Sequence, residues 1–409
     1  MRLRIAALLA LLAALGSPRA LAQTPQELRS LFDANQAFAL RDAVKHENVP
    51  VFFRGAVEES LNQTGPARRD LEKAIAADSH GKQAFEAHEM LANMSWRNGL
   101  YHDALVEADA AHEAEPDSAE LNNMLPLIRA LAESPDMEVV GRRGSRFQMK
   151  VESDRSRGLP ITINGKEVTY GFDSGAALSV MGYADAKFLG LTVKHVDTRL
   201  SESSGSAIPG FDLAFAKDLV IAGLHLRNVV FLVLQDTGEP FVHVPVGNRG
   251  LIGLPVLLAM QTVRWEPSGW FAFGKAARLS KPVAQNLLFH GATPIVLVTV
   301  KDKPLIFSLD TGATDTDLNQ GFAKALPDLV AAGKKETRAI TGLGGSNNYD
   351  SVLLGPVTFS VGGYDVTLKA PHVFPSHSLG SFDGNLGNDI LTQPKSLTLD
   401  FKRMALQLK

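Results

Sequence analysis

The feature that most constrains the fold of this chain is an internal repeat around two acidic turns. Moving the sequence by the 137 positions that separate Asp173 from Asp310 aligns ITINGKEVTYGFDSGA (161–176) with VTVKDKPLIFSLDTGA (298–313) without a gap. Apolar residues coincide at alternating positions, which is typical of β-strands. Each copy then places an Asp, a small hydroxyl residue, a Gly and an Ala after its last strand-like run. The repeat predicts two related β-rich lobes.

The segment before each acidic turn is predicted to be a β-hairpin. Asn164-Gly165 separates two strand-like runs in the first copy, and this dipeptide suits a type I′ turn because both positions need a positive φ. Lys301-Asp302-Lys303 takes the same place in the second copy, as a poorer turn of the same length. The two hairpins are therefore expected to match.

The sequence after each acidic turn continues in a matching order. Each copy has a predicted helix, a stretch rich in Gly and Ser, further strands and an apolar element that ends in Gly. The paired segments are 183–189 with 319–326, 201–210 with 341–348, and 251–253 with 385–387. These matches predict lobes at 142–275 and 285–409, joined by a linker at 276–284.

The N-terminus has the pattern of a secretory signal peptide. Arg2 and Arg4 precede the apolar run 5–15, and Ala20-Leu21-Ala22 fits a cleavage site. The alternative is a membrane anchor, but the apolar run is shorter than the roughly 20 residues that span a bilayer. We therefore expect a signal peptide at 1–22 and a periplasmic or secreted protein. The chain has no Cys, which excludes disulfides, thiolate metal sites and a Cys nucleophile.

Residues 23–135 are predicted to form an α-helical domain. They are rich in Ala, Leu, Glu and Arg, which favour helices. The segment 101–105, followed by Ala108, Ala111 and Pro116, resembles the second helix of a tetratricopeptide repeat. The alternative is a generic Ala-rich helical bundle. This domain contains no residue that we would nominate as catalytic, and a protein partner or substrate is expected to dock there.

The duplicated turns suit hydrolysis by paired carboxylates. A pseudo-two-fold axis between the lobes would bring Asp173 and Asp310 together, and two close carboxyls share one proton. The ionised carboxyl can activate water while the protonated one binds the substrate carbonyl. We predict Asp173 and Asp310 as the catalytic pair.

The neighbouring turn residues are predicted to support this pair. The hydroxyls of Ser174 and Thr311 can form hydrogen bonds across the interface between the lobes, and buried hydroxyls need such partners. Gly175 and Gly312 allow a tight turn and a close approach of the two backbones.

At Asp173-Ser174-Gly175-Ala176 and Asp310-Thr311-Gly312-Ala313 the chain resembles the pepsin/retropepsin family of aspartic proteases. The elements that end at Gly253 and Gly387 resemble the loop that packs behind each catalytic turn in that family. The resemblance covers about two-thirds of the chain, and the Ala after each Gly is similar to retropepsins. It implies a mainly β, two-lobed acid-protease fold preceded by the helical domain. It also implies an aspartic endopeptidase that acts on polypeptides, with a monomer sufficient for the active site.

Two features of this sequence depart from the family's usual pattern. The family closes its cleft with flap hairpins, and the candidate tips are Gly205 and Ser206 in the first lobe and 342–345 in the second. The alternative is that these are plain surface turns. The four residues of the second candidate are Gly342, Leu343, Gly344 and Gly345. Asn385 replaces the first apolar residue of its loop, which we expect to disturb the local packing.

Other chemistries have little support in the sequence. The histidines lack zinc-ligand spacing, the G-x-S-x-G elbow is absent, and no phosphate-binding loop follows the glycines at 342–345. We therefore expect no metal and no cofactor. Asp315 and Asp317 are expected to cap the following helix or to face solvent; the alternative is that they bind a cation.

The alternative function is a catalytically inactive protease fold that binds peptides through its helical repeats. A formal net charge of −3 gives no reason to expect nucleic acid or a membrane as a partner. Because Ala176 and Ala313 lack a hydroxyl that could donate to the carboxylates, we expect the pair to titrate higher and to work in a mildly acidic range.

Overall fold

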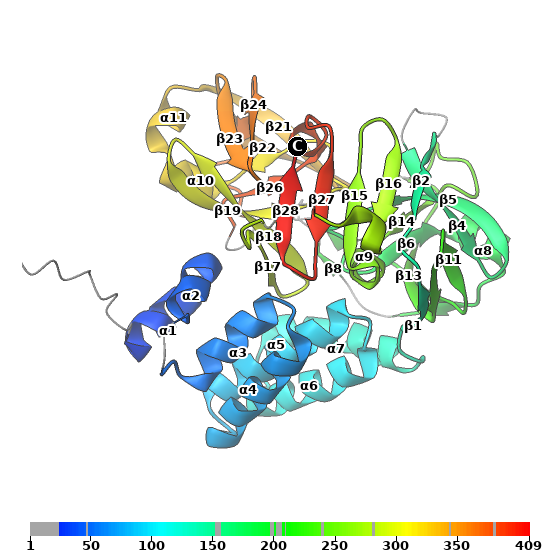
Figure 1. Cartoon of the computed structure of the whole chain (residues 1–409), viewed down its shortest axis with the longest axis horizontal. Coiled ribbons are helices and arrows are strands. Elements are labelled where there is room, and N and C mark those ends of the chain that lie inside the picture. The colour runs from blue at the N-terminus through cyan, green and yellow to red at the C-terminus, as the bar shows by residue number, and fades with distance from the viewer. Residues whose placement is uncertain are drawn as a thin grey trace, which may run out of the picture.

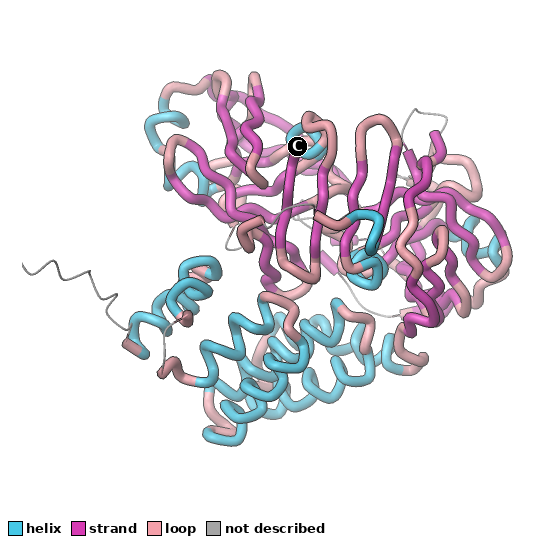
Figure 2. The backbone as a smooth tube through the Cα atoms, viewed as in Figure 1, coloured by secondary structure: helices cyan, strands magenta, loops and turns pink. Residues whose placement is uncertain are grey.

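The computed structural model describes residues 24–45, 48–151, 157–196, 200–201, 207–208, 210–238, 241–279, 283–342, 345–378 and 382–409. It shows a layer of helices along one side of a β-rich part that divides into two lobes (Figures 1 and 2). The expected fold class, a helical region followed by a two-lobed, mainly β fold, is confirmed. The predicted signal peptide lies outside the described residues.

The helical region occupies residues 25–132. Its elements are α1 (Pro25–Asp33), α2 (Ala37–Ala43), α3 (Val51–Ser60), α4 (Thr64–Ala77), α5 (Lys82–Arg97), α6 (Tyr101–Ala114) and α7 (Ala119–Ala132). Helix α1 begins at a capping box in which Thr24 and Glu27 exchange hydrogen bonds. Fully buried alanines such as Ala87 on α5 and Ala104 on α6 let neighbouring helices approach closely. No described helix is both long and apolar enough to cross a membrane.

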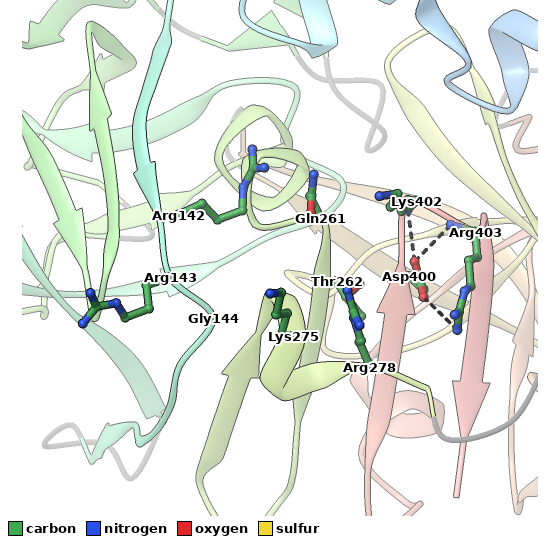
Figure 3. A pocket seen from close by; sticks show the side chains of 11 residues that line it. Arg142, Arg143, Gly144, Gln261, Thr262, Lys275, Arg278, Asp400, Lys402 and Arg403 are labelled. Atoms are coloured by element: carbon green, nitrogen blue, oxygen red, sulfur yellow. Dashed lines mark hydrogen bonds and ion pairs between the residues drawn. The ribbon is translucent and has the colours of Figure 1, made fainter.

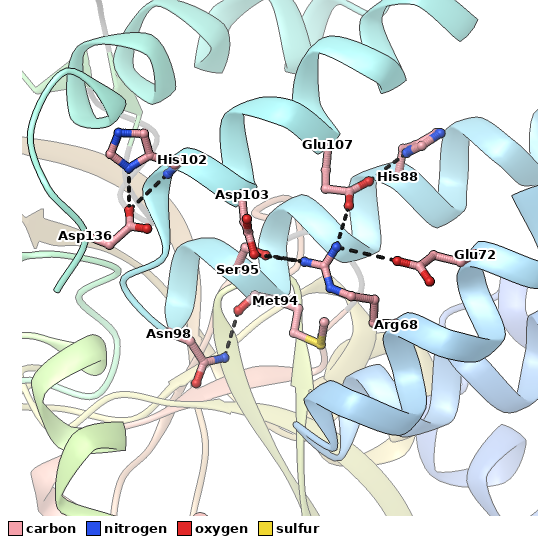
Figure 4. Close-up of polar contacts among 10 residues, drawn as sticks. All are labelled: Arg68, Glu72, His88, Met94, Ser95, Asn98, His102, Asp103, Glu107 and Asp136. Atoms are coloured by element: carbon pink, nitrogen blue, oxygen red, sulfur yellow. Dashed lines mark hydrogen bonds and ion pairs between the residues drawn. The ribbon is translucent and has the colours of Figure 1, made fainter. Parts of the chain in front are cut away.

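A polar network joins three of these helices (Figure 4). The Arg68 guanidinium on α4 donates to Glu107 at 2.8 Å and to Asp103 at 3.2 Å, both on α6. It also reaches the Ser95 hydroxyl on α5 at 3.4 Å, and Nδ1 of His88 lies 2.8 Å from Glu107. Single exposed ion pairs contribute little, but shared partners fix the packing of α4, α5 and α6. Helices α3–α4 and α5–α6 form two hairpins, and their kinship to tetratricopeptide repeats stays a prediction.

Lobe one contains the first acidic turn. Its strands are β1 (Glu138–Arg142), β3 (Lys150–Val151), β4 (Arg157–Ile163), β5 (Lys166–Phe172), β6 (Ser179–Gly182), β7 (Val193–His195), β8 (Leu200–Ser201), β9 (Ala207–Ile208), β10 (Asp212–Ala216), β11 (Leu219–Ile221), β12 (Leu224–Arg227), β13 (Val229–Leu234) and β14 (Gly250–Ile252). The main sheet has the order β1-β12-β11-β4-β5-β14-β6-β13-β10-β7. Helices α8 (Tyr183–Leu189) and α9 (Leu254–Met260) complete the lobe, and α8 matches the predicted helix.

Lobe two repeats this plan around the second acidic turn. Its strands are β17 (Leu287–His290), β18 (Thr293–Val300), β19 (Lys303–Leu309), β20 (Asp317–Leu318), β21 (Lys334–Gly342), β22 (Gly345–Leu353), β23 (Val357–Val361), β24 (Tyr364–Leu368), β25 (His372–Val373) and β26 (Gly384–Leu386). Its helices are α10 (Gln320–Ala325), α11 (Pro327–Ala331) and α12 (Asn388–Leu391). The sheet order is β21-β22-β25-β20-β26-β19-β18-β23-β24.

The two predicted hairpins have the same turn geometry. Asn164 and Gly165 between β4 and β5 have φ values of 47° and 80°, as a type I′ turn requires. Lys301 and Asp302 between β18 and β19 also have positive φ values, 47° and 63°. The second turn therefore keeps the geometry of the first without a Gly, because the register of the strands imposes it.

A sheet between the lobes holds them together. It has the order β2-β16-β15-β27-β28, with β2 (Arg146–Gln148), β15 (Thr262–Trp265), β16 (Trp270–Phe273), β27 (Leu397–Asp400) and β28 (Ala405–Leu408). Lobe one contributes β15 and lobe two contributes β27, and these strands pair antiparallel. Val263 and Leu399 lie opposite each other and belong to one apolar cluster that continues through both lobes. This shared core fixes the lobes relative to each other.

The helical region docks on lobe two through a buried arginine. The Arg97 side chain on α5 is fully buried and forms an ion pair with Glu59 on α3. It also donates to the Gly291 carbonyl between β17 and β18 at 2.8 Å, and it lies 4.7 Å from the centre of the Phe289 ring. Burial raises the pKa of Glu59, and the charge of Arg97 opposes this shift. The buried Glu59 carboxylate therefore depends on Arg97 for a compensating charge.

We expect Arg97→Met to destabilise the full chain by about 3–5 kcal/mol, because it leaves the buried Glu59 carboxylate without its partner. Denaturant unfolding measures this loss. The matched control is Arg129→Met, because the ion pair of Arg129 with Asp109 at 2.9 Å joins side chains that are 57% and 44% exposed. That change should cost less than about 1 kcal/mol. A double change with Glu59→Gln should restore part of the stability. Equal losses for Arg97 and Arg129 would contradict the docking role.

Candidate active site

Each acidic turn follows a strand that a second, parallel strand supports. β14 runs parallel to β5, and β26 runs parallel to β19. The Asp173 N–H donates to the Ile252 carbonyl at 2.8 Å, and the Asp310 N–H donates to the Leu386 carbonyl at 3.1 Å. The elements that end in Gly therefore hold the backbone of both Asp residues from behind, as the family resemblance implies.

The two turns exchange hydrogen bonds across the interface between the lobes. The Ser174 N–H donates to the Thr311 hydroxyl at 2.9 Å, and the Thr311 N–H donates to the Ser174 hydroxyl at 3.2 Å. The Ser174 hydroxyl donates to the Leu309 carbonyl at 2.8 Å, and the Thr311 hydroxyl donates to the Phe172 carbonyl at 3.2 Å. Both side chains are buried. We call these four bonds the cross-lobe clasp.

The clasp brings the two acidic side chains together. Asp173 and Asp310 are half-buried, and their carboxyl groups lie within hydrogen-bonding reach of each other. Gly175 and Gly312 are necessary for this approach. A Cβ on Gly175 would lie 2.9 Å from Cγ of Asp310, and a Cβ on Gly312 would clash with the Asp173 carboxylate.

Backbone amides surround both carboxylates. The Gly175 N–H donates to Oδ1 of Asp173 at 2.7 Å. The N–H groups of Gly312 and Ala313 donate to Oδ1 of Asp310 at 2.9 and 3.0 Å. Such donors stabilise a negative charge at the turns.

The electrostatics of the pair are those of two carboxyls that share a proton. Burial is the largest effect that raises the pKa of Asp173, and the charge of Asp310 adds to it. The backbone bonds from Gly175 and Ala176 oppose the shift. Two carboxyls this close repel each other when both are ionised, so a single proton can be shared between them. Such a pair can deprotonate a water and donate to a carbonyl at the same time.

The structure places an amide from lobe two against this pair. Asn385 on β26 is buried, and its Nδ2 donates to Oδ2 of Asp310 at 3.0 Å. Its Oδ1 accepts a hydrogen bond from the Ser308 hydroxyl at 2.6 Å. The expectation that Asn385 disturbs the packing was wrong, because the amide has polar partners on both sides. The sequence carries a signal for this contact. Lobe two has the polar residues Ser308 and Asn385 at the positions where the first copy has Gly171 and Leu251.

The expectation for Asp315 and Asp317 needs a partial correction. Neither caps α10, because the Asn319 side chain accepts the Gly321 N–H at 2.8 Å. Asp315 is exposed and pairs with Arg338 at 2.6 Å. Asp317 is half-buried on β20, and burial raises its pKa to about 6.

The described strands that flank the candidate flap tips are paired. Gly342 and Gly345 are paired at the end of the β21–β22 hairpin, whereas Leu343 and Gly344 lie outside the described residues. β8 and β9 pair in lobe one, and the intervening Gly205 and Ser206 also lie outside the described residues. Paired flanking strands are compatible with a flap and with a surface turn, so the flap assignment stays a prediction.

A basic groove of about 690 Å³ lies away from the acidic turns (Figure 3). Its charged lining includes Arg142, Arg143, Lys275, Arg278, Lys402, Arg403 and one carboxylate, Asp400. Asp400 is buried and accepts the Lys402 and Arg403 N–H groups. The side chains of Arg142 and Arg143 point in different directions. The groove contains none of the residues of the acidic pair.

Within the described residues, no cluster of three or more His, Asp or Glu side chains is suited to hold a metal ion.

We expect Thr311→Val to destabilise the chain by about 1–3 kcal/mol, because it leaves the buried Ser174 N–H without its acceptor. Denaturant unfolding of the full chain tests this. Thr358→Val is the control, because the Thr358 hydroxyl bonds to Thr367 at 2.8 Å on an exposed face of lobe two. That change should stay within about 0.5 kcal/mol. Similar values for both variants would show that the clasp does not stabilise the fold.

Comparison with known families adds an independent observation. Residues 159–256 match the family model described as aspartyl protease. The matched segment contains the turn at Asp173 and the element that ends at Gly253, and it stops before the second lobe. No curated protein matches the chain. The match supports an aspartyl protease family for this chain.

Proposed function

We propose that this protein is an exported aspartic endopeptidase that hydrolyses polypeptides with a water activated between Asp173 and Asp310. The observation that carries the proposal is the meeting of the two carboxyls, which the duplicated turns and the cross-lobe clasp hold within hydrogen-bonding reach. The aspartyl protease match over 159–256 supports the same reaction class and a polypeptide substrate.

The proposed reaction needs one proton shared by the pair. The ionised carboxylate takes a proton from water, and the water oxygen forms a bond to the carbonyl carbon of the substrate. The protonated carboxyl donates a hydrogen bond to the carbonyl oxygen and stabilises its developing charge. A proton then passes to the amide nitrogen, the C–N bond breaks, and a carboxylic acid and an amine leave. The pair again holds one proton.

Both halves of the proposed site belong to one chain, so a monomer is sufficient. The helical region is proposed to dock substrates or a protein partner, and its buried contact at Arg97 would keep such a docking surface in a fixed position relative to the lobes. Export is proposed from the N-terminal pattern of residues 1–22. The Asp pair and both clasp hydroxyls are present, which argues against the inactive scaffold.

We expect Asp173→Asn and Asp310→Asn each to lower kcat for an unstructured polypeptide by about 10³-fold or more, because neither amide can exchange the shared proton. A statine-type transition-state analogue should inhibit the unchanged protein. The control is Asp302→Asn, since Asn also tolerates the positive φ of 63° at this remote turn. A folded, unchanged protein that binds peptides without cutting them would favour the scaffold instead.

We expect activity in a mildly acidic range. Only the singly protonated pair is active, so activity is lost at high pH when the pair loses its one remaining proton. Because burial and Asp310 raise the pKa of Asp173, that loss should come well above the ordinary carboxyl range. A profile of kcat/KM against pH checks this. An optimum at about pH 2–3, as for a pair with pepsin-like pKa values, would contradict it.

A further inference from the structure

The two halves of the acidic site differ in a pair of residues that lie side by side on neighbouring parallel strands. In lobe one, Leu251 on β14 lies beside Gly171 on β5. In lobe two, the parallel strands place Asn385 on β26 beside Ser308 on β19. An apolar side chain and a glycine in one copy therefore correspond to an amide and a hydroxyl in the other. This substitution in lobe two changes the polar environment of one carboxyl only.

The hydroxyl fixes the orientation of the amide. The Ser308 hydroxyl donates to Oδ1 of Asn385 at 2.6 Å and also lies 3.3 Å from the Gly384 carbonyl. Since Oδ1 takes this hydrogen bond, the NH₂ end of Asn385 faces Oδ2 of Asp310 at 3.0 Å. The reverse orientation would place two acceptors together. Ser308 and Asn385 are each 7% exposed, so water has little access to replace either contact.

The amide favours one of the two charge states. An amide N–H can donate a hydrogen bond to a carboxylate but cannot accept one from the O–H of a carboxylic acid, and hydrogen bonds to an ionised group are the stronger ones. Asp310 receives donors on both oxygens, from Gly312 and Ala313 on Oδ1 and from Asn385 on Oδ2. Asp173 receives the Gly175 and Ala176 N–H groups, and its lobe supplies Leu251 where lobe two supplies the amide.

We propose that Ser308 and Asn385 are positioning residues that place the negative charge of the pair on Asp310 and the shared proton on Asp173. The inference rests on the proposed function, because it assigns Asp310 as the base that takes a proton from water. Asp173 is then the acid that donates to the substrate carbonyl. Neither Ser308 nor Asn385 needs to touch the substrate, since both act through Asp310.

Other charged groups near Asp310 are compatible with this assignment. Asp173 faces it from the opposite turn, and Asp317 on β20 interacts with it as a like charge. The pKa of Asp317 is raised to about 6, so this group is largely neutral in mild acid. Asp315 and Asp389 add negative charge around Asp317, and Arg338 offsets them. In mild acid the Asn385 amide therefore donates to Asp310 with little competing repulsion from Asp317.

The direct test is a titration of the full chain with ¹³C-labelled Asp side chains, which needs no activity. Asp173→Asn and Asp310→Asn spectra assign the two Cγ signals. In mild acid we expect the Asp310 signal at the carboxylate position and the Asp173 signal at the carboxylic acid position. The opposite assignment would overturn the proposal, even for a protein that cleaves peptides. The expected assignment in a protein without cleavage would support the positioning role and refute only the proposed function.

A second test measures pH profiles of variants in which Asn385 or Ser308 is replaced. Asn385 is changed to Leu, the residue that lobe one has at the corresponding position. Asn385→Leu should move the acidic limb of the kcat/KM profile up by about 1 pH unit, because the ionised Asp310 loses a donor. KM should change less than kcat. Ser308→Ala should move the limb in the same direction by less, and Ser308→Thr, which keeps the hydroxyl, should retain the original profile.

Leu251→Ala is the matched control, because it alters packing beside the other turn without removing a donor. Its acidic limb should not move. If the acidic limbs of the kcat/KM profiles of Asn385→Leu and of the unchanged protein coincide, the proposal is overturned. If Asn385→Leu fails to fold in an unfolding assay, the ¹³C titration of Ser308→Ala decides. An Asp310 signal in that variant that ionises at the same pH as in the unchanged protein would count against the positioning role.

Discussion

The close approach of two like-charged groups is the constraint on which the rest of this structure depends. Two carboxyls repel each other when both ionise, so the fold must supply the energy that keeps them together. The cross-lobe clasp does this locally, because Ser174 and Thr311 satisfy each other's buried backbone N–H groups. Separation of the lobes would leave these groups without partners. The β15–β27 pairing and the shared apolar core resist the same separation on a larger scale.

The helical region is part of this rigid arrangement. Arg97 connects α3 and α5 to the start of lobe two, and Phe38 on α2 packs with Leu288 and Ile295 of β17 and β18. A second apolar cluster joins residues of α5–α7 to Leu178 and Val180, which closely follow the first acidic turn. The helices therefore contact both lobes through buried groups, and their removal would expose apolar surface next to the proposed site.

Much of the fold could be predicted from the sequence because the repeat carries it. A gapless match of alternating residues fixes two hairpins, and the turns at Asp173 and Asp310 follow from their position in each copy. The helix at 183–189 was also predictable from local pattern. The role of Asn385 was not, because it depends on which strand lies beside β26 and on the Ser308 hydroxyl in that strand. Likewise, Asn319 caps α10 because β20 ends just before it. The local sequence instead suggested Asp315 and Asp317 as the capping residues. The docking of Arg97 joins residues far apart in the chain, which no local pattern reveals.

The presence of both lobes in one polypeptide has a consequence for how the site can change over time. In an enzyme built from two identical subunits, every substitution appears twice, so an amide introduced beside one acid also appears beside the other. A single gene that encodes both halves removes this restriction. Leu251 and Asn385 occupy corresponding places with opposite polarity. Fusion thus allows each half to specialise by itself.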